Sequence, residues 1–268
     1  MTSRPIRLED RLTPSGREWW AATLAAAADP AAVRRAFPAV GRRLGRGPLD
    51  PAADPADPHA WTIDDAARAE LLRAAAERTR PIDGGGSGEL GALLDSLYTH
   101  GEAAERRGVL RALDVLPPAY AGDTALALLR DALRTNDVRL VAAAAGGPTA
   151  ARILPDDEIA QALLKCLFVG VPLGGVAAVP ERVTPDAARM VADFARERVA
   201  AGRDVPADAW LVLDRHPRAL EAAGIAAELD SPAPGRRAAA RRFLGSRPAA
   251  PPPRPRQGAP TVTTPREG

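Results

Sequence analysis

Leucines that recur every three and four residues constrain the fold of this chain more than any other feature. The spacing is clearest in three successive segments, whose apolar residues are Leu90, Leu93, Leu94 and Leu97, then Val109, Leu110, Leu113 and Leu116, then Leu126, Leu129 and Leu133. Such spacing places side chains on one face of an α-helix. Helices are therefore predicted over residues 89–100, 102–116, 123–134 and 137–145. Because the loops between them are brief, successive helices are expected to pack as antiparallel hairpins.

The apolar composition also favours helices. Hydrophobic residues make up 46% of the chain, whereas aromatic residues make up only 4%. A mixture dominated by alanine, leucine and valine is typical of closely packed helices rather than of sheets. We therefore predict an all-α fold of stacked antiparallel helical hairpins. No strict repeat is visible, and the nearest comparison is an irregular HEAT-like array, in which each helix pair buries its face against its neighbours.

Composition along the chain predicts four segments. Residues 1–40 are expected to form N-terminal helices, 41–60 a linker or surface loop, 61–245 the main helical domain, and 246–268 a disordered tail rich in proline. Glycine, proline and aspartate crowd together in the loop, which is expected to be a poor place for chemistry. The tract 84–88 is interpreted as a flexible linker, because a phosphate-binding loop needs a preceding strand and a lysine or a fixed glycine spacing.

Several helix ends carry capping signals. The first helix is predicted to start at Ser15, with Glu18 as its capping-box partner, and Thr62 is predicted to cap a helix that runs to about residue 80. Thr184 and the proline after it are expected to begin a long helix that ends at Gly202, where glycine accommodates a left-handed backbone. The last helix of the core is predicted over residues 217–229.

Charge and cysteine content limit the compartment and the partners. The chain has 36 basic and 34 acidic residues, so its net charge is only +2 and a nucleic-acid partner is not expected. A single cysteine gives no sign of export to an oxidising compartment, so a cytoplasmic location is predicted. The uncharged run 166–180 is shorter than the roughly 20 residues that a spanning helix needs. We expect this run to lie at the centre of the fold.

Lys165 is the only lysine of the chain and precedes the only cysteine, Cys166. Near the end of a helix, a lysine is favoured by the helix dipole and by donation to free carbonyl groups. Two other interpretations remain open: the amine could contact an anion, or it could form an imine with a substrate. Cys166 is interpreted as a small buried apolar residue, because neither a histidine nor a second thiol is near it in the sequence.

A lattice of charges lies on the long helix that follows Thr184. Arg189, Asp193, Arg196 and Glu197 recur at three-and-four spacing, as on a solvated helix face. The alternative is a polar groove wall onto which Arg139 converges. The candidate ligand-binding residues are therefore Lys165, Arg139, Arg189 and Arg196, and a shared concave pocket would favour ligand binding.

Other chemistry finds no support in the sequence. The three histidines stand far apart and lack carboxylates at metal-ligand spacing, so no metal site and no cofactor are predicted. No residues have the type and spacing of a catalytic set, so an enzyme is not favoured. Arginines at 236, 237, 241 and 242 form a basic helix, interpreted as an ordinary surface helix or as a weak peripheral contact with anionic lipid.

Three stretches together resemble one known family. They are RTNDVRLVAAAAGGP at 134–148, LLKCLFVGVPL at 163–173, and ARMVADFARER at 188–198 with AGR at 201–203. Over residues 89–214 the chain resembles EboA, the helical family of the Ebo gene cluster. The resemblance implies a cytoplasmic protein encoded beside a membrane prenyltransferase and sugar-metabolism-like enzymes, in clusters linked to the traffic or export of secondary-metabolite precursors. It supplies no catalytic residues, and Thr149 stands where the family is expected to have an aromatic residue.

Two functional hypotheses follow from these observations. The first is a non-catalytic helical accessory protein that binds proteins of the same gene cluster, among them the membrane prenyltransferase, and a metabolite. The alternative is an enzyme or carrier for an anionic prenyl or sugar-phosphate metabolite, with Lys165 as the anion contact beside Arg139 and Arg196.

Overall fold

Helices follow one another along the described chain. The structure is a computed structural model that describes residues 7–78, 87–117, 122–179 and 181–248. In the N-terminal half the α-helices are α1 (Pro14–Ala25), α2 (Pro30–Ala36), α3 (Val40–Leu44), α4 (Ile63–Arg78), α5 (Ser87–Thr99), α6 (Ala103–Ala112) and α7 (Asp123–Arg134). In the C-terminal half they are α8 (Val138–Gly146), α9 (Pro148–Ile153), α10 (Asp156–Val169), α11 (Pro185–Ala200), α12 (Trp210–Leu213), α13 (Pro217–Ala222) and α14 (Pro234–Gly245).

Short 3-10 turns join some of these helices, and the described residues contain no strand. The turns are η1 (Leu8–Arg11), η2 (Phe37–Ala39), η4 (Leu173–Gly175), η5 (Ala207–Ala209) and η6 (Ile225–Asp230). One isolated antiparallel bridge joins Pro48 to Thr62. The prediction of an all-α fold is confirmed.

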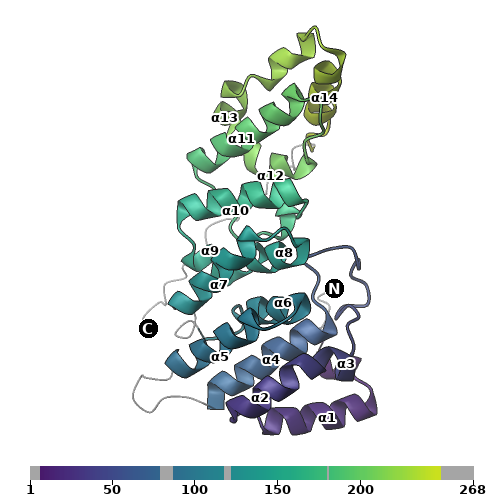
Figure 1. The fold of residues 1–268 in the computed structure, drawn as a ribbon. Helices are drawn as coiled ribbons and strands as arrows, with labels where there is room; N and C mark the ends of the chain where they lie inside the picture. Colours follow the sequence, from purple (N-terminus) through teal and green to yellow (C-terminus); the bar gives the residue numbers. More distant parts are fainter. Residues whose placement is uncertain (1–6, 79–86, 118–121, 180, 249–268) are drawn as a thin grey trace, which may run out of the picture.

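The helices form an elongated stack in chain order (Figure 1). Helices α1 to α3 lie at one end against α4, and the principal contacts then run from α4 to α6, α8, α10 and α11, ending at α14. Each layer therefore packs mainly on the next one, as stacked hairpins require. The comparison with HEAT-like arrays and the division into segments stay predictions.

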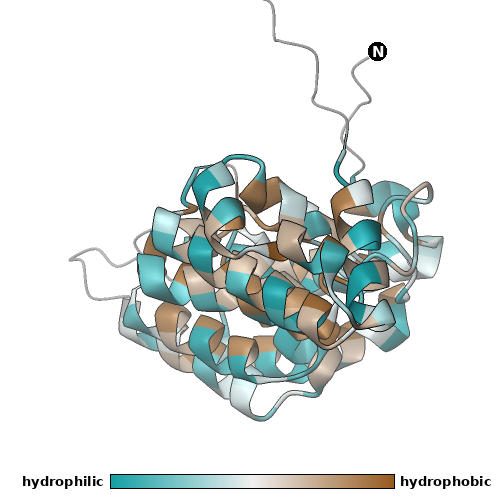
Figure 2. Cartoon of the chain, turned by 90° about the horizontal axis from the view of Figure 1, so that it is seen from above, coloured by the Kyte–Doolittle hydropathy of each residue, from teal (hydrophilic) through white to brown (hydrophobic). Residues whose placement is uncertain are grey.

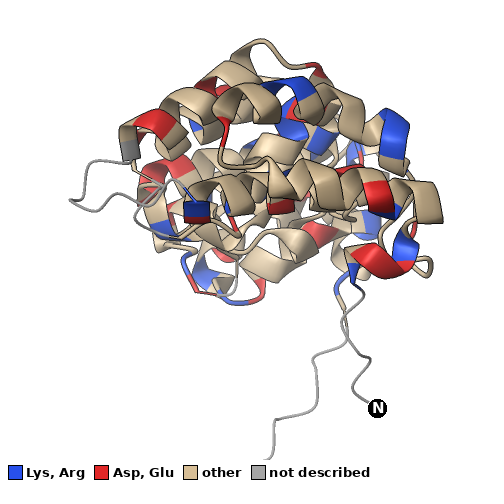
Figure 3. Cartoon of the chain, turned by 90° about the horizontal axis from the view of Figure 1, so that it is seen from below, with Lys and Arg blue, Asp and Glu red and all other residues tan. Residues whose placement is uncertain are grey.

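The predicted leucine stripes form the core. Leu93, Leu94, Leu110, Leu113 and Leu129 are all buried in one hydrophobic cluster, which runs from the N-terminal helices to α14. Hydrophobic and hydrophilic residues alternate along the helices in Figure 2, as amphipathic helices require. Basic and acidic residues are interspersed in the view of Figure 3, which agrees with the small net charge.

The capping predictions for the two ends of the long helix after Thr184 are confirmed, and the prediction for the first helix is wrong. Thr184 Oγ1 accepts a hydrogen bond from the N–H of Ala187, and Gly202 has the expected left-handed backbone, with φ of 69°. Helix α1, however, starts at Pro14 rather than at Ser15, because Thr13 caps it through a 3.1 Å bond from the N–H of Gly16. A proline at the first helical position loses no helical hydrogen bond, so this start is favoured.

Two other expectations need correction. The predicted helix over 217–229 is interrupted, because Gly224 adopts a φ of 65° and separates α13 from η6. Within the described residues 166–179 of the uncharged run, Cys166, Leu167 and Leu173 are buried as expected, but Phe168 is 72% exposed. Most of the glycine tract 84–88 and nearly all of the predicted tail lie outside the described residues.

Candidate functional site

The structure separates the four candidate ligand-binding residues. Lys165 lies on α10 in a groove against α11, whereas Arg139 lies on α8 and lines a different cavity. Arg189 and Arg196 lie on α11, each within 4 Å of the Asp193 carboxylate, at 3.6 and 3.7 Å, and line neither hollow. The four residues therefore do not share one pocket, and the two α11 arginines belong to an exposed charge lattice.

Lys165 has a partner that the sequence did not suggest. Its Nζ donates a 2.7 Å hydrogen bond to Oδ1 of Asn136, in the turn before α8, rather than to a carbonyl at the end of its own helix. The amine therefore links α10 to the preceding hairpin. Cys166 beside it is buried as predicted, and burial raises the pKa of its thiol to about 12.

The groove beside Lys165 is the more apolar of the two hollows. We call it the α10–α11 groove; it has a volume of about 520 Å³ and is lined by Gln161, Leu164, Lys165, Phe168, Met190, Asp193, Phe194 and Glu197. Phe168 is the most exposed large hydrophobic residue of the described chain. The charges at the rim of this groove are one lysine and two carboxylates, so it does not favour an anion.

A network of buried charges connects α4 to α6. Arg68, which is fully buried, donates through Nη1 to Asp64 Oδ2 at 2.6 Å, one helical turn away. Arg107 of α6 donates through Nε to Asp65 Oδ1 at 2.8 Å and through Nη2 to Thr62 Oγ1 at 3.1 Å. Buried charges are tolerated where they are paired and hydrogen-bonded in this way. The network therefore fixes the position of the Arg107 guanidinium.

Arg111, one turn further along α6, holds the loop that precedes α4. Its Nη2 donates to the carbonyl oxygens of Pro58 and His59, at 3.3 and 2.8 Å, and its guanidinium lies 5.2 Å from the centre of the Trp61 ring. Burial lowers the pKa of Arg111 from its ordinary value. The ring Nε2 of His59 lies 2.7 Å from the carbonyl oxygen of Pro172, so the loop is also attached to the segment after α10.

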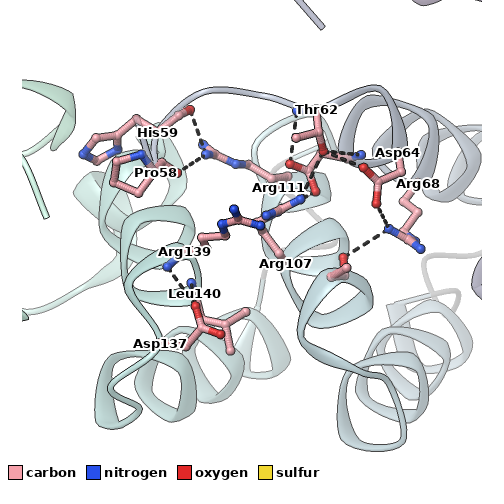
Figure 4. A network of polar contacts seen from close by, with 12 residues as sticks. Pro58, His59, Thr62, Asp64, Arg68, Arg107, Arg111, Asp137, Arg139 and Leu140 are labelled. Atoms are coloured by element: carbon pink, nitrogen blue, oxygen red, sulfur yellow. Dashed lines mark hydrogen bonds and ion pairs between the residues drawn. The ribbon is translucent and has the colours of Figure 1, made fainter. Parts of the chain in front are cut away.

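This loop and the buried network enclose a polar cavity of about 230 Å³, which we call the arginine cavity. Its lining consists of Arg46, Pro48, Pro55, Asp57, Pro58, Ala60, Trp61, Thr62, Asp64, Ala104, Arg107 and Arg139. Figure 4 shows the side chain of Arg139 reaching from α8 toward that of Arg107 on α6. A segment that we expected to be a poor place for chemistry thus supplies one wall of this polar cavity.

The sequence contained a signal for this cavity. Arg107 and Arg111 lie four residues apart on α6 and flank the apolar residues of its stripe, and Asp64 and Asp65 follow Thr62 in the first turn of α4. Charged residues that share a face with buried leucines need partners inside the protein. The pairing itself spans more than 40 residues, so the sequence alone does not reveal it.

The remaining sequence expectations concern metal ligands, membrane spans and the basic helix α14. Within the described residues, no three side chains of the metal-ligating types form a cluster, and no helix has the length and apolar character needed to cross a membrane. On α14, Arg242 pairs with Asp204 at 2.5 Å, Arg236 lies 3.8 Å from Glu228, and Arg237 donates to backbone carbonyls. Most of this basic helix is therefore engaged within the protein, and its contact with lipid stays a prediction.

The fold defines an all-α protein of stacked helices, and its described part has an apolar groove between α10 and α11 and a polar cavity beside α4, α6 and α8. Residues 23–214, more than half of the chain, match the family model described as Metabolite traffic protein EboA. The chain therefore belongs to the EboA family, and the matched region includes both the arginine cavity and the α10–α11 groove. Neither the curated proteins nor the solved structures contain a match to it.

Proposed function

We propose that this protein is a non-catalytic accessory protein of metabolite traffic, and that it binds a partner protein through the α10–α11 groove. The family description supports the role in metabolite traffic. The observation that carries the binding role is Phe168, which is 72% exposed and lines an apolar groove. An exposed aromatic side chain beside a hollow is typical of an interaction site.

The groove fits an amphipathic helix. Leu164 and Phe168 on α10, and Met190 and Phe194 on α11, are each four residues apart and line the groove from two packed helices. A helix can lay an apolar stripe between two such rows of side chains. The partner segment that we propose is therefore an amphipathic helix with apolar residues at three-and-four spacing.

The rim charges specify the flanks of this helix. Lys165 lies on the α10 side, whereas Asp193 and Glu197 lie on the α11 side. A complementary helix carries acidic residues along one flank and basic residues along the other. We propose that it belongs to a protein of the same gene cluster, which serves the biosynthesis or export of a secondary-metabolite precursor.

The alternative, an enzyme or carrier that holds an anionic prenyl or sugar-phosphate metabolite with Lys165, has less support. Lys165 is bonded to a neutral amide and shares its groove with two carboxylates, and Arg139 lines a different cavity. A Lys165→Met variant that folds and binds metabolite like the wild type would exclude this alternative.

The test is association of the purified chain with each protein of the cluster, measured by calorimetry. Phe168→Asp is expected to weaken binding by about thirtyfold, the loss typical of an anchoring aromatic residue. Leu211→Asp is the matched control, because Leu211 is also exposed, at 42%, but lies on α12 outside the groove. Its affinity is expected to stay within about twofold of wild type. No association with any cluster protein, or equal affinities of both variants, would refute the proposal.

A further inference from the structure

We infer that the arginine cavity is a binding site for a small phosphorylated metabolite. The inference rests on the cavity itself, and it goes beyond the partner-binding role proposed for the α10–α11 groove. It names a second site, formed by the loop before α4 together with α4, α6 and α8.

Unpaired positive charge is the first observation. Arg46 and Arg139 both line the cavity, and within the described residues neither side chain forms an ion pair or a hydrogen bond. By contrast, other arginines of the described chain form 14 ion pairs. Two free guanidinium groups that face one cavity repel each other until an anion lies between them.

The acidic residues of the cavity do not supply that anion. Asp64 is already paired with the buried Arg68 at 2.6 Å, and Arg107 is paired with Asp65 at 2.8 Å. Asp57 uses Oδ1 to accept a 2.9 Å hydrogen bond from the backbone N–H of His59, so it is engaged in the turn of the loop. The paired charges cancel, and the lining retains the charge of two arginines against one aspartate.

The cavity is held open by rigid surroundings. The Trp61 ring is fixed against the Arg111 guanidinium, and three prolines of the loop, at 48, 55 and 58, line the same wall. The Arg46 side chain packs closely on Gly41 of α3, because a Cβ atom added to Gly41 would lie only 2.7 Å from Nε of Arg46. A cavity whose walls are already positioned loses less conformational entropy when a ligand binds. The cavity is therefore built before its ligand arrives.

Size and donor geometry indicate the ligand class. The volume of about 230 Å³ lies below the range of roughly 300–1,000 Å³ that is usual for drug-sized ligands. A dinucleotide or a long prenyl chain is thus too large. Guanidinium groups bind phosphate through paired N–H donors, and a terminal phosphate offers three oxygens to arginines that approach from separate elements. A phosphate monoester with a short organic part against Trp61 fits these features.

The experiment is isothermal titration calorimetry of the full chain with inorganic phosphate, glycerol 3-phosphate and malonate at low salt. We expect saturable binding of both phosphates, tighter binding of the ester, and a loss of affinity as sodium chloride is raised. Arg139→Gln and Arg46→Gln are each expected to weaken phosphate about tenfold or more, since each removes charge-assisted hydrogen bonds. Arg34→Gln is the control, because Arg34 is an exposed arginine of α2 outside the cavity, and it is expected to change affinity less than twofold.

The outcomes separate cleanly. Arg46 and Arg139 are exposed, so their glutamine variants should keep the wild-type urea unfolding midpoint. A shifted midpoint would identify a variant that is defective in folding. No saturable phosphate binding, or wild-type affinity in the Arg46→Gln/Arg139→Gln double variant, would overturn the site. Malonate binding as tight as that of phosphate would overturn the ligand class. The measurement uses the isolated chain, so its failure is distinct from a failure of partner binding.

Discussion

Arg68→Met should destabilise the fold far more than the same substitution five residues away on the same helix. Arg68 is fully buried and donates to the Asp64 carboxylate at 2.6 Å and to the carbonyl oxygens of Phe37 and Ala104, each at 3.2 Å. Methionine keeps much of the apolar stem but removes all three hydrogen bonds. The Asp64 carboxylate, which is also fully buried, then retains only the Thr62 hydroxyl as a partner.

The expected cost can be estimated from this burial. Removing one partner of a buried ion pair costs about 3–5 kcal/mol, because the other charge stays out of water. With a urea slope of about 3 kcal/mol/M, the unfolding midpoint should fall by about 1–1.7 M. The matched control is Arg73→Met, since Arg73 pairs with Glu77 at 2.5 Å while both side chains are largely exposed. An exposed pair of this spacing contributes about 0.3–0.5 kcal/mol, so the control midpoint should move by less than about 0.2 M.

Urea unfolding followed by circular dichroism and by tryptophan fluorescence provides the assay, and coincident transitions are required for a two-state interpretation. Asp64→Asn combined with Arg68→Met removes both charges and should recover part of the loss, with a coupling energy of about 1–3 kcal/mol. Equal midpoints for Arg68→Met and Arg73→Met would show that Arg68 is not part of a buried charge network. The buried charge network that fixes Arg107 in the wall of the arginine cavity would then be wrong as well.

Three further predictions concern separate sites. Gly108→Ala on α6 should destabilise the protein despite the better helix propensity of alanine, because the new Cβ would lie 2.5 Å from Cδ of Arg68. Gly88→Ala on α5 should be neutral or stabilising, because its new Cβ would have no neighbouring atom within 4 Å. Urea unfolding midpoints of the two variants provide the comparison. Burial raises the pKa of Asp114 in the folded protein above its ordinary value of 3.8, so the ionised carboxylate disfavours folding. The free energy of unfolding is therefore expected to fall as pH rises from 3.8 through the raised pKa of the folded state. The stability of Asp114→Asn relative to wild type should therefore rise between about pH 4 and pH 7, and a fall over that range would contradict the assignment. Cys166 should resist alkylation by iodoacetamide at pH 8 in the native protein and react once urea unfolds it, as mass spectrometry would show, because its buried thiol has a pKa of about 12.

The fold was predictable because its signals are local. Leucines at three-and-four spacing identify a helical face regardless of where the rest of the chain lies, and the Thr184 cap and Gly202 end need only their neighbours. The prediction failed at Ser15, where a threonine and a proline just upstream form a better start. It failed again at Gly224, because a single left-handed residue interrupts an otherwise continuous apolar pattern.

The candidate site was not predictable in the same way. Lys165 drew attention because it is the only lysine, yet its amine bonds to Asn136 and faces an apolar groove. Arg107 contacts a carboxylate 42 residues earlier in the chain, and Arg139 joins the same cavity from a third segment. Charged residues on amphipathic helices usually lie in solvent, and only tertiary packing shows that Arg107 is buried and that the exposed Arg139 lies at the same cavity. Of the four predicted residues, Arg139 is the one that the structure places in the arginine cavity.

The α10–α11 groove and the arginine cavity differ in charge, and this difference distinguishes the ligands that we propose for them. The α10–α11 groove combines apolar side chains with Lys165, Asp193 and Glu197, so a phosphate is repelled there, whereas the arginine cavity has Arg46 and Arg139 without partners in the described chain. Burial of apolar surface is little affected by moderate salt, but attraction between exposed charges weakens as added salt shortens the Debye length. Raising sodium chloride should therefore release phosphate from the cavity while a partner helix stays bound to the groove. Opposite behaviour, with salt dissociating the partner and sparing phosphate, would mean that the two sites have been assigned the wrong ligands.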